Sequence, residues 1–526
     1  MVTGWYLYRL PVNSRIVCDQ YRCGPSSASN PDVATITNLR YRSGTRYHLD
    51  SFTHIYLFNL AANSISQLTD GHFNDNSIAW SHNSQFLAFE SNRFGNPHVD
   101  DNTDIFTISP ANSKISRITE GHGPERYPQW SPNDKSISYL SRDKANDFSS
   151  LINLCTIEIN KRVSVNLTSG FDYNISRHHW GADSKSIYFL GDVRGNTHLF
   201  KINVRTHKFK PIITGNQGIY DYLLYRQDSF YFLSSDNLTP SDLYYYTKNR
   251  STNITKINTP LLDALSLVEP EEFFFQSNDS LNVHGWLMRP TASFDGSTYP
   301  LIVQIHGGPH WHYSNTFNFE FQLLAASGYA LFYCNPRSST SYGEAFAKLG
   351  VNDWAGKDVD DILSGLAYIL TNHDDIDSTR LGVTGGSYGG YLTTWIIAHT
   401  DKFKAAVTQR SISNLISFYG TTDLQALIEH EFGPPWEVDN YQRLLTKSPI
   451  KYAHNIKTPL LILHSELDYR VPISHAEELF TILKRNDVTT QFIRFKNEGH
   501  DLSRRGKPNN RAARLSQIID WFNQYL

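Results

Sequence analysis

The chain has 526 residues and a mass of 60.1 kDa, which exceeds the size at which one hydrophobic core usually stops growing, so we expect at least two domains. Lys and Arg (48) nearly balance Asp and Glu (51), and the net charge of -3 is not gathered in long single-sign runs. Binding to nucleic acid or to a membrane surface calls for a clustered basic face, so neither is a predicted partner.

From the sequence we expect no membrane helix, no secretory signal and no disulfide framework. The longest apolar stretches, such as PLIVQIHGG, are shorter than the roughly 18 residues of a membrane helix and are interpreted as buried strands. The first residues lack a charged segment followed by an apolar one, so a cytoplasmic chain is expected. The cysteines are too few for a disulfide framework and are expected to be reduced: Cys18, Cys23, Cys155 and Cys334.

An internal repeat organises the first half of the chain. Trp80, Trp130 and Trp180 each open a strand-turn-strand pattern, and they are spaced 50 residues apart. Such units are typical of β-propeller blades, and we expect four to five of them between about residues 35 and 265. The tryptophans are interpreted as core anchors between neighbouring blades rather than as ligand contacts.

From about residue 282, strands alternate with helices. This alternation predicts a doubly wound, mostly parallel sheet. The clearest helix covers 357–373, where apolar residues recur at helical spacing: Val359, Ile362, Leu363, Leu366 and Ile369. The sequence therefore predicts a β-propeller domain over residues 1–280 and an α/β domain over residues 281–526.

The segment LGVTGGSYGGY places four glycines around Ser387. A buried strand precedes it and a helix follows, which is the strand-turn-helix context of the nucleophile elbow in α/β-hydrolases. A side chain at Gly385 or Gly389 would collide with the turn or block the serine. A phosphate-binding loop would need a following lysine or the spacing G-x-G-x-x-G, and neither is present. Ser387 is therefore the predicted nucleophile.

A serine nucleophile requires a base, and the order along an α/β-hydrolase chain is serine, acid, histidine. The strand LLILH is followed by a loop with Glu466 and Asp468. Asp468 lies further into the loop, whereas Glu466 is expected to face solvent, so Asp468 is the predicted acid. Of the two later histidines, His475 falls in the first turn of the next helix. His500 follows a strand and a short glycine-containing loop, and it is the predicted base.

Two backbone N–H groups are expected to stabilise the oxyanion. Tyr388 is the first helical residue after the nucleophile, and its N–H is the first predicted donor. The segment IHGGPH ends a buried strand, and its glycines let the backbone approach a ligand closely. Gly308, or alternatively Gly307, is the second predicted donor.

The histidines of the same region resemble a metal site at first sight. His306, His310 and His312 have no helical register, and no carboxylate lies beside them in the sequence. We therefore predict neither a metal nor a cofactor.

Five motifs follow the propeller repeats in this order: HGGPH, NPRSSTSYG, GGSYGGY, HSELDYRVP and NEGH. With these motifs the chain resembles the prolyl oligopeptidase family of serine peptidases, most of all its acylaminoacyl-peptidase and dipeptidyl-peptidase branch. The resemblance implies a propeller that caps the active site and admits short peptides. It also implies that Arg470, two residues after the acid, holds substrate carbonyl groups; a structural ion pair is the alternative.

The chain departs from the family pattern in two places. Relatives carry glycines in the loop NPRGSTGYG, where this chain has Ser338 and Ser341, so the local backbone freedom is expected to differ. Family propellers have seven or eight blades, and fewer than about 280 residues cannot supply them, so the propeller is expected to be incomplete. Either blades are missing from the N-terminus or the propeller is an open one. Unpaired edge strands would favour pairing between chains, which makes a homo-oligomer a further prediction.

The predicted function is a serine peptidase that removes acylated N-terminal residues or dipeptides from short peptides by acyl transfer. One alternative is a carboxylesterase that uses the same triad. A second is a propeller-hydrolase relic with impaired catalysis, although the intact elbow, acid and base argue against it.

Overall fold

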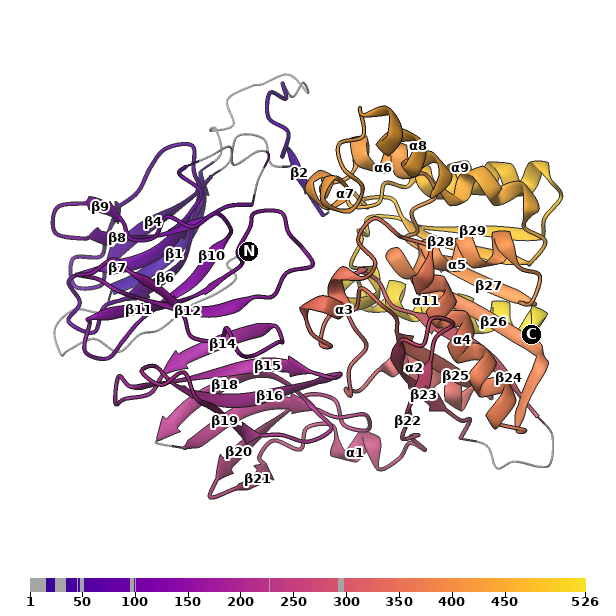
Figure 1. Cartoon of the computed structure of the whole chain (residues 1–526), viewed down its shortest axis with the longest axis horizontal. Coiled ribbons are helices and arrows are strands. Elements are labelled where there is room, and N and C mark those ends of the chain that lie inside the picture. The colour runs from indigo at the N-terminus through magenta and orange to yellow at the C-terminus, as the bar shows by residue number, and fades with distance from the viewer. Residues whose placement is uncertain are drawn as a thin grey trace.

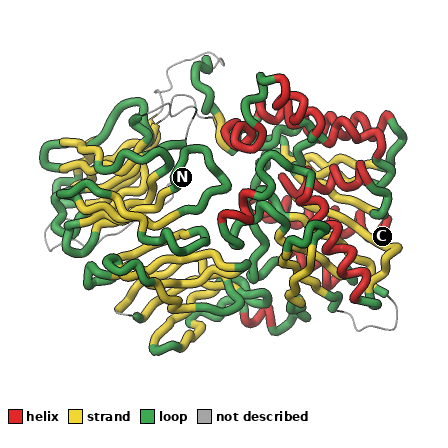
Figure 2. Tube along the Cα trace, viewed as in Figure 1, coloured by secondary structure: helices red, strands yellow, loops and turns green. Residues whose placement is uncertain are grey.

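The computed structural model describes residues 16–23, 35–44, 46–47, 52–94, 99, 101–226, 228–291 and 298–526. Figure 1 shows two parts side by side, one built mainly of strands and loops and one of a sheet with helices on both faces, and Figure 2 shows the same division by secondary structure. Cys155 and Cys334 are buried free thiols, whereas the side chains of Cys18 and Cys23 lie outside the description.

Antiparallel units of three or four strands build the first part, and we distinguish five of them within the described residues. The last two units are joined by one parallel pair, Thr197 of β16 with Gly218 of β18, into a single eight-stranded sheet. The strands of the units, in chain order, are β1 (Ile16–Cys23), β4 (Phe52–Asn59) and β5 (Ser64–Gln67); β6 (Asp75–Trp80), β7 (Leu87–Ser91), β8 (Asp104–Ser109) and β9 (Lys114–Arg117); β10 (Glu125–Trp130), β11 (Ser136–Ser141), β12 (Asn153–Glu158) and β13 (Ser164–Asn166); β14 (Ile175–Trp180), β15 (Ser186–Val193), β16 (Asn196–Asn203) and β17 (Phe209–Ile213); β18 (Gly218–Arg226), β19 (Ser229–Ser235), β20 (Asp242–Thr247) and β21 (Arg250–Asn253).

The repeated tryptophans end the first strands of the middle three units. Trp130 and Trp180 are buried, and the indole of Trp180 donates to the carbonyl of Gln129 in the preceding unit at 3.1 Å. Trp130 packs in one cluster with Ile105 of the unit before it. The tryptophans thus join one unit to the next, as expected for blade anchors.

A short hairpin, β2 (Arg42–Ser43) and β3 (Arg46–Tyr47), and the helix α1 (Thr259–Leu262) lie outside the five units. The hairpin reaches the second part of the molecule: the amide of Tyr469 donates to the carbonyl of Gly44 at 2.8 Å, and the rings of Tyr47 and Tyr469 lie 4.7 Å apart.

One eight-stranded sheet organises the second part. Its spatial order is β22 (Glu271–Gln276), β23 (Asn282–Met288), β25 (Ala330–Asn335), β24 (Tyr299–Ile305), β26 (Ile376–Gly386), β27 (Ala405–Gln409), β28 (Leu460–Ser465) and β29 (Thr490–Phe495). The strands from β25 to β29 run parallel, and β22 and β23 are antiparallel. The predicted boundary between residues 280 and 281 falls in the turn between β22 and β23, and the division into domains there stays a prediction.

Helices cover both faces of this sheet: α2 (Phe319–Ala326), α3 (Glu344–Lys348), α4 (Lys357–Asn372), α5 (Tyr388–His399), α6 (Leu415–Thr421), α7 (Gln425–Phe432), α8 (Val438–Thr446), a 3-10 helix (Pro449–Asn455), α9 (Ser474–Arg485), α10 (Leu502–Arg505) and α11 (Pro508–Tyr525). Val303 packs in the cluster of α4, α5 and α9, whereas its neighbour Ile302 packs in the cluster of α2 and α11. Successive strand residues therefore serve opposite layers, as the strand period requires. No helix among the described residues is long and apolar enough to cross a bilayer.

Two serines stand where the related loop has glycines, and both adopt backbone angles that glycine favours. Ser338 has φ 77° and Ser341 has φ 79°. Ser341 also joins the two parts of the molecule: its Oγ accepts from the amide of Gly195 at 2.9 Å, and its carbonyl accepts from the amide of Arg194 at 2.8 Å. The loop between β15 and β16 is thereby held against the loop after β25.

Candidate active site

Ser387 lies in the tight turn between β26 and α5, with φ 60° and ψ -120°. This strained conformation is the one expected for a nucleophile elbow. Glycine is required at position 389, because a Cβ there would lie 2.1 Å from the carbonyl oxygen of Ile305 in β24. The close contact between β24 and α5 therefore fixes the height at which the serine projects.

We expect Gly389→Ala to lower the melting temperature and reduce kcat/KM by at least about 100-fold, because the added methyl group pushes α5 and Ser387 away from β24. Gly420→Ala is the matched control, since a Cβ at Gly420 in α6 meets nothing within 4 Å. Equal activity of the two variants would show that the close contact at Gly389 does not position the serine.

The structure brings the three predicted catalytic side chains together. Nε2 of His500 lies 3.1 Å from Oγ of Ser387, and Nδ1 of His500 lies 2.7 Å from Oδ2 of Asp468. His500 is 6% exposed and Asp468 is 1% exposed. The second carboxylate oxygen accepts from the amides of Arg470 at 3.1 Å and Val471 at 2.9 Å, so the carboxylate is held in one orientation. Serine, imidazole and carboxylate form a continuous hydrogen-bonded chain.

Burial opposes ionisation of Asp468, but the positive charge and hydrogen bond of His500 keep the pKa of this carboxyl below its usual value. Burial also lowers the pKa of His500 below 6.5, against the opposing effect of Asp468. At neutral pH the imidazole is therefore neutral and able to accept a proton from Ser387.

The pH dependence of activity follows from this shift. Protonated His500 cannot act as a base, so kcat/KM is expected to be full at pH 7 and to fall as the pH drops through a value below 6.5. The measurement is a profile of kcat/KM between pH 4.5 and 8 at constant ionic strength. An acidic limb centred above pH 6.5 would contradict the assignment of His500 as the buried base.

Glu466 and His475, which the sequence analysis did not assign to the triad, have other partners. Glu466 pairs with Arg494 at the surface, with an N–O distance of 3.2 Å. His475 is buried in the first turn of α9, where Oγ of Ser413 donates to its carbonyl oxygen at 2.9 Å. His464 donates from Nε2 to the carbonyl of Val471 at 2.7 Å and so supports the loop that carries Asp468.

One predicted oxyanion donor, Tyr388, directly follows Ser387 in the chain, and the other, Gly308, lines the cavity beside Ser387. Tyr388 is the first residue of α5, and its N–H has no acceptor within the helix. Gly308 lines the cavity and has φ 135°, a backbone angle that favours glycine. Gly307 lines it as well, and a Cβ on Gly307 would lie 3.5 Å from Cβ of Ser387.

The side chain of Tyr388 fixes the nucleophile elbow to the first turn of α4. Its hydroxyl donates to the carboxylate of Asp358, a buried residue in the first turn of α4. Burial raises the pKa of Asp358 to about 6 despite this hydrogen bond. The amide of Gly356 donates to the same carboxylate at 2.7 Å, so the start of α4 is tied to the start of α5.

Arg470 lines the cavity, as the resemblance implies, and it also forms the alternative ion pair. Its guanidinium donates to both oxygens of Asp423, at 3.0 Å and 2.8 Å. Asp423 also accepts from the amide of Gly44 at 2.9 Å. A role of Arg470 in holding substrate stays a prediction.

The three neighbouring histidines contact different partners. His306 bonds to Oγ of Ser339 at 3.0 Å, and His312 bonds to Oγ1 of Thr340 at 2.8 Å. His310 lies 2.6 Å from Glu431, a buried carboxylate that is distant in sequence and so gave no signal there. Together with His430 these two residues lie close enough for a metal ion, but Ser149 and Trp354 also bond to the same group.

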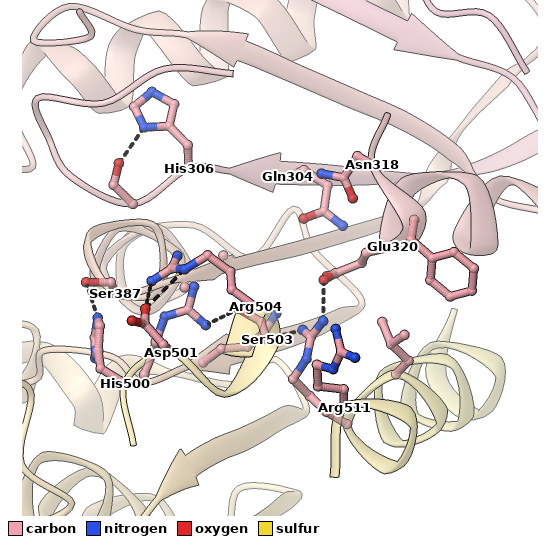
Figure 3. A pocket seen from close by; sticks show the side chains of 18 of the residues that line it. Gln304, His306, Asn318, Glu320, Ser387, His500, Asp501, Ser503, Arg504 and Arg511 are labelled. Atoms are coloured by element: carbon pink, nitrogen blue, oxygen red, sulfur yellow. Dashed lines mark hydrogen bonds and ion pairs between the residues drawn. The ribbon is translucent and has the colours of Figure 1, made fainter. Parts of the chain in front are cut away.

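A cavity of about 1290 Å³ opens beside Ser387 and His500 and extends toward α2 and α11 (Figure 3). One functional candidate in its wall was missed by the sequence reasoning. Arg410 follows β27, and a Cβ at Gly386 would lie 2.7 Å from its Nη2. The glycine before the nucleophile therefore makes room for a guanidinium, and no local pattern in the sequence signals that contact.

Comparisons with known proteins match both parts of the chain. Residues 315–526 match the model of the prolyl oligopeptidase family. The chain is 41% identical to the uncharacterized peptidase YuxL of Bacillus subtilis over 66% of this chain and 53% of the relative. It is 30% identical to dipeptidyl-peptidase 5 of Porphyromonas gingivalis over 74% of this chain and 58% of the relative. The chain thus spans little more than half the length of these curated relatives.

Solved structures confirm the predicted fold class of a propeller joined to an α/β-hydrolase. The acylaminoacyl peptidase of Pyrococcus horikoshii superposes with a TM-score of 0.84 at 22% identity, over 98% of this chain and 80% of that chain. A puromycin hydrolase gives a TM-score of 0.75 at 15% identity, over 99% and 78% of the two chains. The family model and the curated relatives show that the chain belongs to the prolyl oligopeptidase family.

Proposed function

We propose that this protein is a serine peptidase that cleaves short peptides near their N-terminus by acyl transfer through Ser387, His500 and Asp468. The observation that carries the proposal is the hydrogen-bonded chain from Oγ of Ser387 through His500 to Asp468, at 3.1 Å and 2.7 Å, on the wall of a large cavity.

The reaction proceeds in two steps. His500 takes the proton of Ser387 as its oxygen attacks the peptide carbonyl, and Asp468 stabilises the imidazolium that forms. The amides of Tyr388 and Gly308 stabilise the oxyanion, with Gly307 as the alternative second donor. The imidazolium then protonates the leaving amine, and water activated by His500 releases the acyl group. No metal or cofactor enters these steps.

The arrangement of the two parts supports short peptides as substrates. The loop between β15 and β16 contacts the loops after β24 and β25: the amide of Asn315 donates to the carbonyl of Gly195 at 2.8 Å. Asp172 accepts from the amide of Glu344 at 3.0 Å. These contacts hold the propeller against the loop after β24, part of which lines the cavity, and we expect this neighbour to hinder a folded protein from reaching Ser387.

Exposed aromatic side chains on the cavity wall support a peptide rather than a small polar substrate. Trp311 is 66% exposed and Phe319 is 56% exposed, and both line the cavity. Such side chains offer apolar area to the side chains of a bound peptide. Peptides are the proposed partners; nucleic acid and membranes are not, and a homo-oligomer and a cytoplasmic location stay predictions from the sequence.

The test of the proposed function compares two chromogenic substrates on the full chain. One is an N-acetylated amino-acid anilide and the other is a dipeptide anilide with a free amine, with Ser387→Ala as the control. Faster turnover of the blocked substrate would indicate removal of acylated residues, and faster turnover of the free dipeptide would indicate dipeptidyl activity. The ester that matches the acetylated anilide is assayed beside them. Hydrolysis of this ester alone, with both anilides untouched, would overturn the proposal in favour of a carboxylesterase.

A further inference from the structure

The cavity beside Ser387 carries an excess of positive charge. Its described lining contains six arginines but two carboxylates, Glu320 and Asp501. Figure 3 shows Arg504, Asp501 and Ser503 close to Ser387 and His500, with Arg511 and Glu320 further along the cavity. A cavity of this charge favours a ligand that bears a negative group.

Three of the arginines are neutralised by carboxylates. Arg470 pairs with Asp423 at 2.8 Å, Arg514 pairs with Glu320 at 2.7 Å, and Arg504 pairs with Asp501. Arg505 and Arg511 are exposed to solvent, where a charge needs no partner.

Arg410 differs from all of these. It is partly buried in the cavity wall, and within the described chain the only bond of its side chain is a long one, 3.3 Å from Nη1 to Oγ of Ser503. Its Nε is buried without a partner. Because burial of a charged group is costly unless it is paired, this guanidinium is suited to pair with an anionic group of a ligand.

The backbone also indicates a functional position. Arg410 has φ 41°, which costs a residue with a side chain of order 1 kcal/mol or more and is typical of functional sites. Its guanidinium packs against Gly386, the residue before the nucleophile. Burial and the neighbouring arginines Arg504 and Arg514 lower the pKa of Arg410 to about 10, so the group is still cationic at pH 7.

The location of Arg410 also indicates which side of the scissile bond this residue would contact. His500 delivers its proton to the leaving amine, so the leaving group lies toward the imidazole and the residues that follow it. Ser503, to which Arg410 bonds, is three residues beyond His500. Resting on the peptidase function proposed above, we infer that Arg410 binds a carboxylate carried by the leaving group. This carboxylate is the C-terminus of a short peptide or an acidic side chain directly after the cleaved bond.

Three peptides that share the residues before the cleaved bond test this inference on the full chain. The leaving group is a neutral residue with a free carboxyl terminus, the same residue as its amide, or glutamate as its amide. We expect wild-type kcat/KM to be at least tenfold higher for a carboxylate-bearing peptide than for the neutral amide. The free acid and the glutamate amide separate the two sources of the carboxylate.

Variants assign the preference to a residue. Arg410→Met should bring the ratio of kcat/KM values close to one, and Arg410→Lys, which keeps the charge but not the forked geometry, should give an intermediate ratio. Arg494→Met removes an arginine that pairs with Glu466 away from the cavity and should keep the wild-type ratio. A preference that survives Arg410→Met but is lost in Arg505→Met would overturn the inference.

A binding measurement separates this inference from the proposed function. Calorimetric titration of the Ser387→Ala protein with the free-acid and amide peptides requires no turnover, and tighter binding of the acid by at least tenfold is expected. Cleavage of all three peptides at equal rates would overturn the role of Arg410 and leave the peptidase function intact. Absence of cleavage together with tighter binding of the acid would overturn the peptidase function and leave the role of Arg410 intact.

Discussion

Ser387→Ala is expected to reduce turnover of either anilide by about 10⁵- to 10⁶-fold, because the attacking oxygen is removed and no other group can form the acyl-enzyme. The fold should persist, since among the described residues the side chain makes a single hydrogen bond, to His500, and His500 keeps its bond to Asp468. Alanine at this position must adopt the same φ of 60° as serine, so the substitution adds no backbone strain. The measurement is kcat/KM together with the melting temperature.

Unchanged turnover in Ser387→Ala would exclude the serine as nucleophile. Loss of activity together with a large fall in the melting temperature would contradict the claim that this side chain is dispensable for folding.

Asp468→Asn is expected to lower kcat by about 10⁴-fold with little change in KM. The carboxylate accepts from Nδ1 of His500 at 2.7 Å, and this contact leaves Nε2 without a proton and able to accept one from Ser387. An asparagine amide turned toward Nδ1 would donate instead, which places the proton on Nε2 and removes the base. Steady-state kinetics on the anilides measure the effect.

Glu466→Gln is the matched control for Asp468→Asn. It makes the same carboxylate-to-amide change two residues earlier in the same loop, where the side chain pairs with Arg494 at the surface. Its kcat is expected to stay within about twofold of wild type, since exposed ion pairs contribute little. Equal losses in the two variants would indicate that the loop, rather than the Asp468 carboxylate, is what matters.

The parts of the fold with local sequence signals were predictable. Propeller repeats follow from tryptophans at a spacing of 50 residues, and the helix 357–373 follows from its apolar period; the structure has α4 at Lys357–Asn372. The G-x-S-x-G turn, the acid loop and the late histidine also carry their information within a few residues. The structure brings Ser387, His500 and Asp468 within hydrogen-bonding distance of one another, and their catalytic roles stay predictions.

Features that depend on contacts between distant segments were not predictable. The bond between Tyr388 and Asp358, the pairing of Arg470 with Asp423, and the packing of Arg410 against Gly386 each join residues from different elements. The positive φ of Ser341 is another example, because its cost is offset by bonds to Arg194 and Gly195 of the propeller. Such partners become visible only when the sheet order is known.

Labelling with a fluorophosphonate probe tests the central claim most directly, because the probe reacts with a serine only when a base activates it in an intact oxyanion site. Mass spectrometry of the labelled full chain should show one adduct, on Ser387, and none in Ser387→Ala. The adduct should also disappear in His500→Ala. An unlabelled but folded wild-type protein, or an adduct on another serine, would contradict the account.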